Sequence, residues 1–311
     1  MKVHYGIDNF SGAKNAIVTT GTFDGVHRGH SKILDRLRKS CEAAQGESVL
    51  LTFHPHPRLV LFPDNTDLKL LNSQNEKLEL LEKAGLDHVI IHPFTREFSR
   101  TSSLEYVRDI LVNKIDVHKL VIGYDHHFGR NREGSFETLN EYAHVYNLLV
   151  EEIPAEELNH VNISSTKIRN ALLAGDVETA NSFLNHPYGI RGTVISGQKI
   201  GRKLGFPTAN IQADDHHKLI PKDGAYAVKV FVDSSSYAGM MNIGFRPTVS
   251  GGTSKTIEVH LLDFEADLYD KQLQVEFVKR LRDEVPFSDI EALKAQLLQD
   301  SNKTRELVVL K

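Results

Sequence analysis

The 311-residue chain has no tryptophan, three methionines and one cysteine. Because Cys41 is the single cysteine, a disulfide within the chain is excluded. Cys41 lies in a stretch of helical periodicity, which predicts a buried thiol. No apolar run has the length that a membrane-spanning helix needs. The first twenty residues lack the continuous apolar segment of a signal peptide. We therefore expect a cytoplasmic protein with no membrane association.

Neither sign of charge is in large excess, since 37 basic and 41 acidic residues give a formal net charge of -4. This balance argues against bulk electrostatic binding to nucleic acid or to an anionic membrane, but it leaves room for a small basic nucleotide pocket. The pattern GxxxxGK[ST] does not occur, which excludes a P-loop kinase. The sequence contains no internal repeat and carries no indication of oligomeric state.

The first half of the chain alternates short apolar runs with segments of helical periodicity. This alternation predicts an α/β, Rossmann-like domain, in which a parallel sheet is covered on both faces. Ligands of such sheets bind beyond the carboxyl ends of the strands. Strands are expected at residues 16–20, 48–53, 87–91 and 119–123, and helices at about 33–44, 73–83, 103–113 and 135–146.

The second half has a different pattern, in which apolar and polar residues alternate along short segments. Period-two alternation at 226–232, 257–261 and 273–277 predicts an antiparallel β-barrel. A final helix at about 289–299 is expected to close this domain with Ile290, Leu293, Leu297 and Leu298 on one side. A cluster of helix breakers at 185–189 places the boundary, so the predicted domains are 1–185 and 186–311.

The segment GTFDGVHRGH, residues 21–30, follows an expected strand and opens an expected helix. Glycines allow a tight turn, and a helix N-terminus offers N–H groups to a phosphate. His27 and His30 stand at that helix start, where they can donate hydrogen bonds to phosphate oxygens. A glycine-rich turn with two surface histidines fits the residues equally well. The candidate binding residues are Gly21, Phe23, Asp24, Gly25 and Gly29, and the candidate catalytic residues are His27 and His30.

A resemblance to a known family separates these two interpretations. His27–His30 resembles the HxGH signature of the nucleotidyltransferase superfamily, whose members join an adenylyl or cytidylyl group to a phosphate and release pyrophosphate. Residues 163–169, ISSTKIR, resemble a second signature of that superfamily. The hydroxyls of this segment can cap a helix. The resemblance implies instead that Ser164, Ser165 and Thr166 bind the triphosphate, with Arg169 as a fixed cation.

Two further segments resemble the FAD synthetase module of bacterial bifunctional flavin enzymes. They are residues 53–57, FHPHP, and 123–129, GYDHHFG. Asp125 is the acidic residue of the second segment and a candidate for positioning the nucleotide. His126 and His127 depart from the family, which often has an aromatic and a basic residue there. Paired histidines could also indicate zinc, but one cysteine and no paired helical histidine motif argue against a zinc site.

A glycine-rich, basic segment lies near the start of the second domain. Residues 197–210 read GQKIGRKLGFPTAN, which alone fits a long hairpin loop. GFPTAN resembles the motif of riboflavin kinases, and the oxygens of Thr208 and Asn210 are of the kind that Mg2+ accepts beside nucleotide phosphates. The other candidate nucleotide-binding residues are Gly197, Lys199, Gly201, Lys203, Gly205, Phe206 and Pro207.

The resemblance to riboflavin kinases continues through residues 223–227, 242–249, 257–264 and 267–277. It implies that Glu276 is the general base that acts on the 5'-hydroxyl of riboflavin. Glu276 alternates with Val275 and Phe277, so its side chain is expected to face away from the core. Asp270 stands where the family usually has glycine, and we expect a turn residue with a left-handed backbone.

The resemblance covers nearly the whole chain and implies a bifunctional riboflavin kinase and FAD synthetase. The second domain would convert riboflavin and MgATP to FMN and ADP, and the first would convert FMN and MgATP to FAD and pyrophosphate. The expected partners are these small molecules, without nucleic acid or membrane. Three alternatives stay open: an enzyme with one active domain, a flavin or nucleotide sensor without turnover, and a nucleotidyltransferase for another phosphate-bearing substrate.

Overall fold

The computed structural model describes residues 1–64, 68–155, 157, 163–197, 201, 204–247 and 253–310. The chain divides into two compact units, Met1–Ser164 and Ser165–Lys311. No helix in these described ranges combines the length and the apolar character that crossing a membrane requires. The predicted boundary at 185/186 was placed at the change in sequence pattern, and it stays a prediction.

Two helices that precede residue 185 pack with the second unit. They are α7 (Ser165–Ala174) and α8 (Val177–Leu184). The backbone N–H of Lys222 donates to the carbonyl of Leu172 over 3.0 Å. The Asn181 side chain donates to the carbonyl of Phe277 over 2.8 Å and accepts from the N–H of Tyr188 over 2.7 Å. These bonds explain why the compact unit begins earlier than the change in sequence pattern.

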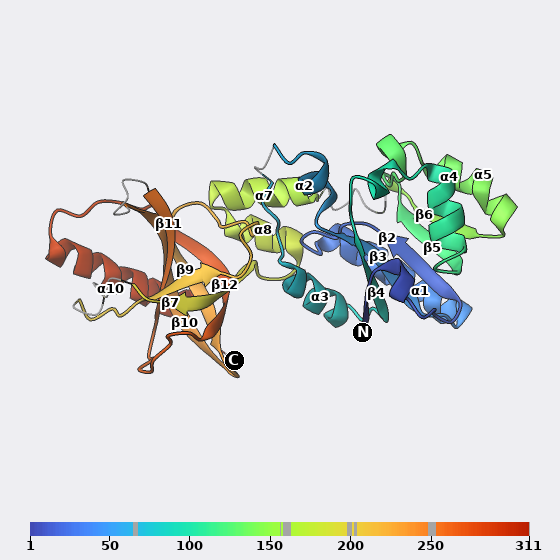
Figure 1. Ribbon diagram of the computed structural model, residues 1–311. Coiled ribbons are helices and arrows are strands. Elements are labelled where there is room, and N and C mark those ends of the chain that lie inside the picture. The colour runs from blue at the N-terminus through green and yellow to red at the C-terminus, as the bar shows by residue number, and fades with distance from the viewer. Residues whose placement is uncertain are drawn as a thin grey trace. The chain divides into compact units, whose positions relative to one another are not determined.

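The first unit is built on a six-stranded sheet in which every neighbouring pair is parallel. Its order is β1-β4-β3-β2-β5-β6 (Figure 1). The strands are β1 (Lys2–Tyr5), β2 (Ala16–Thr20), β3 (Ser48–His54), β4 (His88–Pro93), β5 (Val117–Gly123) and β6 (Leu149–Ile153). The four predicted strands are confirmed as β2 to β5. The two edge strands were not predicted, because short strands with polar residues carry a weak pattern.

Helices cover both faces of this sheet (Figure 1). α1 (Arg28–Ala44) and α3 (Gln74–Lys83) pack against one face, and η3 (Tyr106–Val112) and α5 (Phe136–Tyr146) against the other. Because both faces are covered, β2 is buried along its whole length. The remaining short elements are η1 (Ile7–Asn9), α2 (Pro57–Leu61), η2 (Phe98–Arg100), α4 (Ser103–Glu105) and η4 (Arg130–Arg132). Cys41 is buried on α1, as predicted, and burial raises the pKa of its thiol to about 11.

The second unit contains a closed six-stranded barrel in which neighbouring strands are antiparallel. Its order is β10-β11-β8-β7-β12-β9. The strands are β7 (Gly189–Ile195), β8 (Ala209–Ala213), β9 (Gly224–Val232), β10 (Ser235–Pro247), β11 (Thr253–Leu261) and β12 (Gln272–Arg282). Alternate apolar residues of β9, β11 and β12 are buried, which confirms the period-two prediction. Asp270 has the expected left-handed backbone, with φ of 62°.

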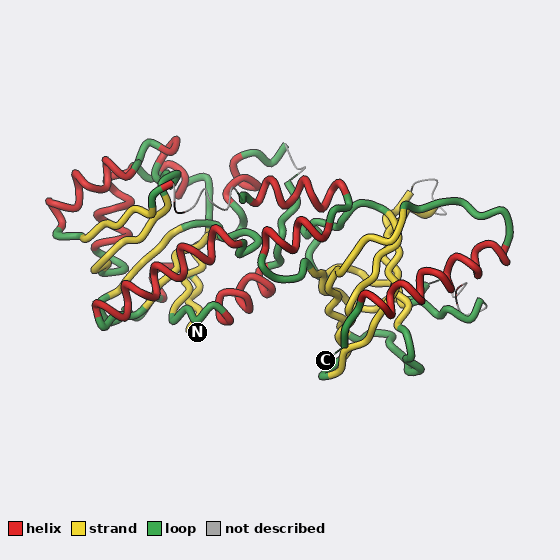
Figure 2. The backbone as a smooth tube through the Cα atoms, turned by 180° about the vertical axis from the view of Figure 1, so that it is seen from behind, coloured by secondary structure: helices red, strands yellow, loops and turns green. Residues whose placement is uncertain are grey.

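The last helix, α10 (Ile290–Leu307), lies alongside the barrel strands (Figure 2). Its predicted apolar face is wrong in part, because Ile290 and Leu298 are exposed. The buried side chains are instead Asp300, Ser301 and Thr304, near the middle and end of the helix. Arg282 of β12 donates to the carboxylate of Asp300 over 2.9 Å. A buried polar contact therefore helps to fix the helix where a hydrophobic one was expected.

Candidate functional site

The strand order of the parallel sheet reverses between β2 and β5, at the carboxyl ends of these strands. From β2 the chain proceeds to β3 and β4 on one side, and β5 and β6 lie on the other side. Such a reversal is where open α/β sheets bind ligands. The loop at 21–27 leaves β2 at this edge, and the loop at 124–128 leaves the neighbouring β5. The fold therefore brings two of the sequence motifs to one edge.

The two histidines of the first motif stack at the start of α1. His27 is the N-cap, and its Nδ1 accepts a hydrogen bond from the backbone N–H of His30 over 3.4 Å. Because Nδ1 is the acceptor, neutral His27 carries its proton on Nε2. The two rings lie 3.7 Å apart at 12°, and the ring of Phe23 stacks on His30 at 4.5 Å. The three rings form one stack at the helix N-terminus, where a phosphate would find N–H donors.

His30 is the member of this stack with unused hydrogen-bonding capacity. Its Nδ1 is buried and has no hydrogen-bond partner in the described part of the chain. Burial, the neighbouring His27 and the positive charge of Lys77 hold the pKa of His30 well below its usual value. The ring is therefore neutral at pH 7 and carries one N–H and one acceptor nitrogen.

Two buried polar side chains, Asp24 and Lys77, form hydrogen bonds that fix the turn before the histidines. The Asp24 carboxylate accepts hydrogen bonds from the backbone N–H groups of Leu71 and Asn72, over 3.0 and 3.3 Å. On the other side, Lys77 Nζ donates to the carbonyl of Thr22 over 3.4 Å. Asp24 was predicted to bind the nucleotide, whereas these bonds show it holding the adjacent segment. Its role toward a ligand stays a prediction.

Glycine is favoured at two points of this motif. Gly25 has φ of 88°, a conformation that L-residues rarely adopt. A Cβ at Gly29 would lie 3.1 Å from the His27 ring, so another residue there would displace that ring slightly. Gly21 lies close to the Phe23 ring, 3.2 Å from where its Cβ would stand.

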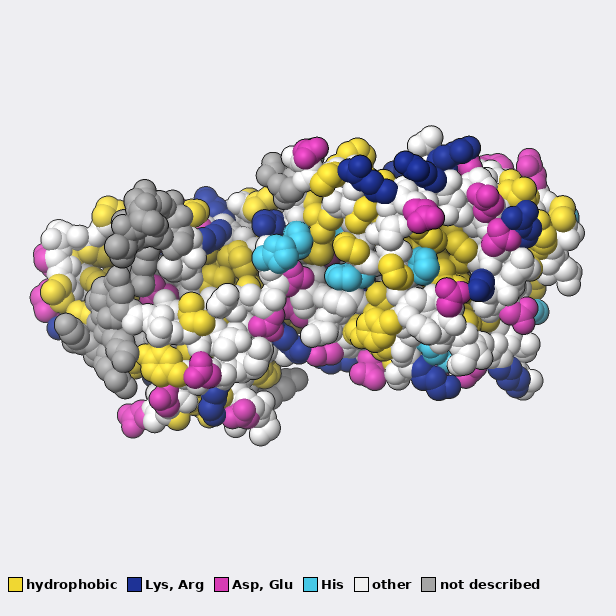
Figure 3. Space-filling model, viewed as in Figure 1, with side chains coloured by type: hydrophobic (Ala, Val, Ile, Leu, Met, Phe, Trp, Pro, Cys, Tyr) yellow, Lys and Arg dark blue, Asp and Glu magenta, His cyan; other side chains and the backbone are white. Residues whose placement is uncertain are grey.

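In the loop after β5, Asp125 and His127 are exposed and His126 is half-buried. The ring of His126 stacks on Phe128 at 6.0 Å, and burial lowers the pKa of His126 to about 4. Its Nε2 has no hydrogen-bond partner among the residues that the structure describes. His127 points its Nδ1 to the carbonyl of Gly134 at 3.3 Å. Histidine side chains also reach the surface in the region of α2 and β3 (Figure 3).

The second nucleotidyltransferase motif lies at the start of α7. Ser165 is the first residue of that helix, Thr166 is exposed, and Arg169 is half-buried. Ser164 is the last residue of the first unit, while the other three belong to the second unit. Their joint action with His30 stays a prediction.

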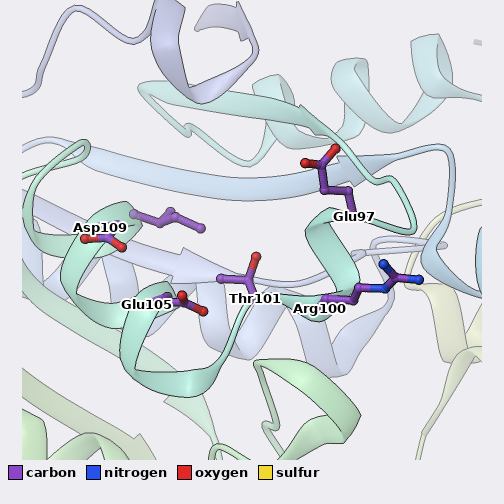
Figure 4. A pocket seen from close by; sticks show the side chains of 6 residues that line it. Glu97, Arg100, Thr101, Glu105 and Asp109 are labelled. Carbon is purple, nitrogen blue, oxygen red and sulfur yellow. The ribbon is translucent and has the colours of Figure 1, made fainter.

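A separate pocket of about 390 Å³ lies in the first unit (Figure 4). Two of its carboxylates are already engaged, since Glu105 accepts from Ser102 and Asp109 pairs with Arg108. None of the residues predicted from the motifs lines it. Its lining residues are Glu97, Arg100, Thr101, Glu105, Asp109 and Ile110.

The barrel carries its own group of polar residues, on β11 and next to the start of β8. The Thr208 hydroxyl donates to the Glu258 carboxylate over 3.1 Å. Asn210 lies directly opposite Glu258 in the β8–β11 register, so the two side chains share the outer face of the barrel. Three hard oxygen donors, a hydroxyl, an amide carbonyl and a carboxylate, therefore meet at one place. This donor set suits Mg2+.

The described residues just before Thr208 form a tight turn. The N–H groups of Leu204 and Phe206 donate to the carbonyl of Gly201, and Gly205 has φ of 85°. His260 Nδ1 lies 2.7 Å from the carbonyl of Pro207, and its ring packs edge-on against Phe206. Burial lowers the pKa of His260. Lys199 and Lys203, which were predicted to bind phosphates, lie outside the described residues.

One described cluster has the side chains and spacing to hold a metal ion. Asp215, His216 and His217 offer ligand atoms within 4.8 Å of one another. The N–H of His217 donates to the Asp215 carboxylate over 2.8 Å, which is a local turn contact. The single cysteine argued against zinc, whereas this described cluster combines one carboxylate with two imidazoles, which are also zinc ligands.

Family models match both halves of the chain. A model described as FAD synthetase matches residues 10–167, and one described as riboflavin kinase matches residues 184–308. A curated bifunctional riboflavin kinase/FMN adenylyltransferase from Pseudomonas fluorescens is 39% identical over 294 residues, which are 94% of this chain and 93% of the relative. The chain belongs to the bifunctional riboflavin kinase/FMN adenylyltransferase family.

Other relatives of this family span the chain in the same way. The protein of the same description from Escherichia coli strain K12 is 37% identical over 98% of this chain and 97% of its own length. The one from Listeria monocytogenes is 36% identical over 94% and 92%. A crystal structure described as a macrolide-efflux protein from Streptococcus pneumoniae superimposes with a TM-score of 0.89 at 28% identity, covering 98% of this chain and 99% of that one.

Within the riboflavin kinase region, the structure does not bring Glu276 to Thr208 and Asn210. Glu276 lies opposite Gly189 on β7, whereas Asn210 lies opposite Ile195 on the same strand. Six residues of strand separate the two positions, about 20 Å at roughly 3.3 Å per residue. A general base must lie within hydrogen-bond reach of its proton donor, so this separation argues against Glu276 acting beside the GFPTAN motif.

Glu258 is the carboxylate that the sequence analysis missed. It lies in IEVHLLDF, a segment that resembles riboflavin kinases, but its alternation with buried Ile257 and Val259 is the same pattern as that of Glu276. Its low exposure of 9% is the distinguishing feature, because a strand glutamate on an outer face is normally solvated. Only the pairing of β11 with β8 places it at the motif.

We expect Gly197→Ala to weaken the riboflavin kinase activity. A Cβ at Gly197 would stand 2.1 Å from Asn210 Nδ2, so the asparagine must move. A shift of about 1 Å at a site can cost roughly 10- to 100-fold in rate. FMN formation measured against ATP concentration tests this, with Ser196→Ala as the matched control on the neighbouring exposed residue. Equal rates for the two variants would contradict a role of Asn210 in the site.

Proposed function

We propose that this enzyme forms FMN from riboflavin and ATP in the barrel, and FAD from FMN and a second ATP at the sheet edge. The observation that carries this proposal is the presence, in one chain, of both family regions in order, each with its own group of buried polar residues. FAD synthetase and riboflavin kinase activities belong to the family.

In the kinase reaction, Glu258 replaces Glu276 as the proposed general base. Its carboxylate would take the proton of the riboflavin 5'-hydroxyl while that oxygen forms a bond to the terminal phosphorus of ATP. The bond from that phosphorus to the bridging oxygen breaks, and ADP leaves. Thr208 and Asn210 would hold Mg2+, which neutralises phosphate charge when bound. The proximity of Glu258 to Thr208 supports this assignment.

In the adenylyl transfer, a phosphate oxygen of FMN would attack the α-phosphorus of ATP. The bond to the bridging oxygen breaks and pyrophosphate leaves. His27 and His30 would donate hydrogen bonds to the phosphate oxygens as charge develops, with the N-terminus of α1 behind them. Ser164, Ser165, Thr166 and Arg169 would bind the triphosphate, and Asp125 would position the nucleotide. The neutral state of His30 suits donation without a net positive charge.

Incubation with riboflavin, ATP and Mg2+, followed by chromatography, tests the proposed function. We expect FMN to appear first and FAD afterwards. Removing Mg2+ with a chelator is expected to stop both products, because both reactions use ATP, whose phosphate charge the metal neutralises. Excess Mg2+ should restore them. Formation of one product alone would support a single active unit, and flavin binding without product would support a sensor.

A further inference from the structure

Lys77 is a buried lysine on α3, behind the motif that carries the histidines. It is 7% exposed. Lysine is almost never buried unless it is paired, because an ammonium group loses its hydration there. The same helix ends with Lys83, which is exposed, as lysine usually is. The position of Lys77 therefore calls for an explanation beyond helix formation.

The ammonium group of Lys77 contacts the GTFDG turn directly. Its Nζ donates to the Thr22 carbonyl over 3.4 Å and to Thr52 Oγ1 over 3.2 Å. The Thr52 hydroxyl in turn donates to the same carbonyl over 3.3 Å. A lysine on α3, a threonine on β3 and the backbone after β2 thus form one closed set of hydrogen bonds. This set fixes the first peptide of the turn that leads to His27.

The titratable groups near Lys77 come from the turn and from α1. Asp24 is the carboxylate that acts on it, and Asp24 binds the backbone of Leu71 and Asn72 just before α3. His30 on α1 is influenced by the charge of Lys77 and by His27, the N-cap of that helix, while β3 contributes the neutral Thr52. The turn is therefore tied to α3 by a cation and to the segment before α3 by an anion.

We propose that Lys77 is a positioning residue for adenylyl transfer, whose buried ammonium group fixes the Thr22–Asp24 turn and sets the charge that the paired histidines experience. This inference rests on the function proposed above for the first unit. Burial lowers the pKa of Lys77 to about 8, an effect that Asp24 opposes, so the side chain is mostly charged at pH 7. That charge is one cause of the low pKa of His30, after burial and His27.

The test compares Lys77→Met, Lys77→Arg and the control Lys83→Met in the full chain. For Lys77→Met we expect kcat for FAD formation from supplied FMN to fall at least about tenfold, because the turn loses its anchor. FMN formation by the same chain should not change. The melting temperature should not fall, since methionine removes a buried charge. Lys83→Met should match the wild-type protein in all three measurements.

The pH profile separates a positioning role from simple filling of space. Without the Lys77 charge the pKa of His30 should rise, so the acidic limb of FAD formation in Lys77→Met should move to higher pH. In the wild-type protein, FAD formation should decline as the pH rises through about 8 and Lys77 loses its proton. Lys77→Arg, which stays charged, should keep the wild-type acidic limb and remain active at higher pH.

Two outcomes would overturn this inference. Lys77→Met with the wild-type kcat and pH profile would make Lys77 a space-filling residue. If Lys77→Met fails to fold, Lys77→Arg provides the test. If FAD formation in Lys77→Arg declines above pH 8 as it does in the wild-type protein, the titration of Lys77 is not the cause of the decline. A wild-type protein that forms no FAD from FMN would instead contradict the proposed function itself, which is a different result.

Discussion

Glu258→Gln is expected to lower FMN formation by about 100- to 10,000-fold, the range that loss of a general base produces. Glutamine has the same shape and still offers an oxygen to the Thr208 hydroxyl, so the contact of 3.1 Å can persist. It lacks the basicity to take the proton of the riboflavin hydroxyl. Rates of FMN formation at saturating riboflavin and MgATP measure this directly.

Glu276→Gln is the matched control for this prediction, because both glutamates alternate with buried apolar residues on barrel strands. We expect it to retain FMN formation, since Glu276 lies opposite Lys229 and Gly189, away from the GFPTAN motif. FAD formation from supplied FMN should be unchanged in both variants. If Glu276→Gln abolishes FMN formation and Glu258→Gln does not, the general base is Glu276, as the sequence first predicted.

His30→Ala is expected to lower FAD formation by about 100- to 1,000-fold while FMN accumulates. Removing one preorganised hydrogen-bond donor from a developing oxyanion has this magnitude. The loss also removes a ring from the stack with His27 and Phe23. Chromatography of a reaction that starts from riboflavin would show FMN rising to the level that the wild-type protein converts to FAD.

A control for His30→Ala comes from the exposed His216 of the second unit. His216→Ala should leave FAD formation unchanged, and the kinase rate of His30→Ala should equal that of the wild-type protein. Wild-type FAD formation in His30→Ala would exclude the phosphate-binding role. Loss of both activities together would indicate a folding defect, which the melting temperature would reveal.

The parallel sheet could be predicted from sequence because its strands are buried on both faces. Ala16–Thr20 is fully buried, so its run of apolar and β-branched residues stands out from its neighbours. The edge strands Lys2–Tyr5 and Leu149–Ile153 have partly exposed, mixed patterns and could not be separated from loop. They are extended because each pairs with a central strand, β1 with β4 and β6 with β5.

The position of the proposed kinase carboxylate could not be predicted from the sequence. Glu258 and Glu276 both have apolar neighbours, and both resemble parts of one family. Barrel closure and strand register place Glu258 beside the GFPTAN motif, since β8 pairs with β11 and not with β12. The burial of Lys77 is another fact of tertiary structure, because the periodicity of α3 alone does not tell an inward lysine from an exposed one.

The closed barrel has a consequence for how the kinase residues are kept in place. β8 pairs with β7 along Asn210–Ala213 and with β11 at Ala209 and Asn210, so the strand has a bonded neighbour on both sides at Asn210. Its amides can exchange with solvent deuterium only when bonds to a neighbour open. The amides of Asn210–Ala213 that pair with β7 should therefore exchange slowly. The strand that carries Asn210 would then already be ordered when a substrate binds.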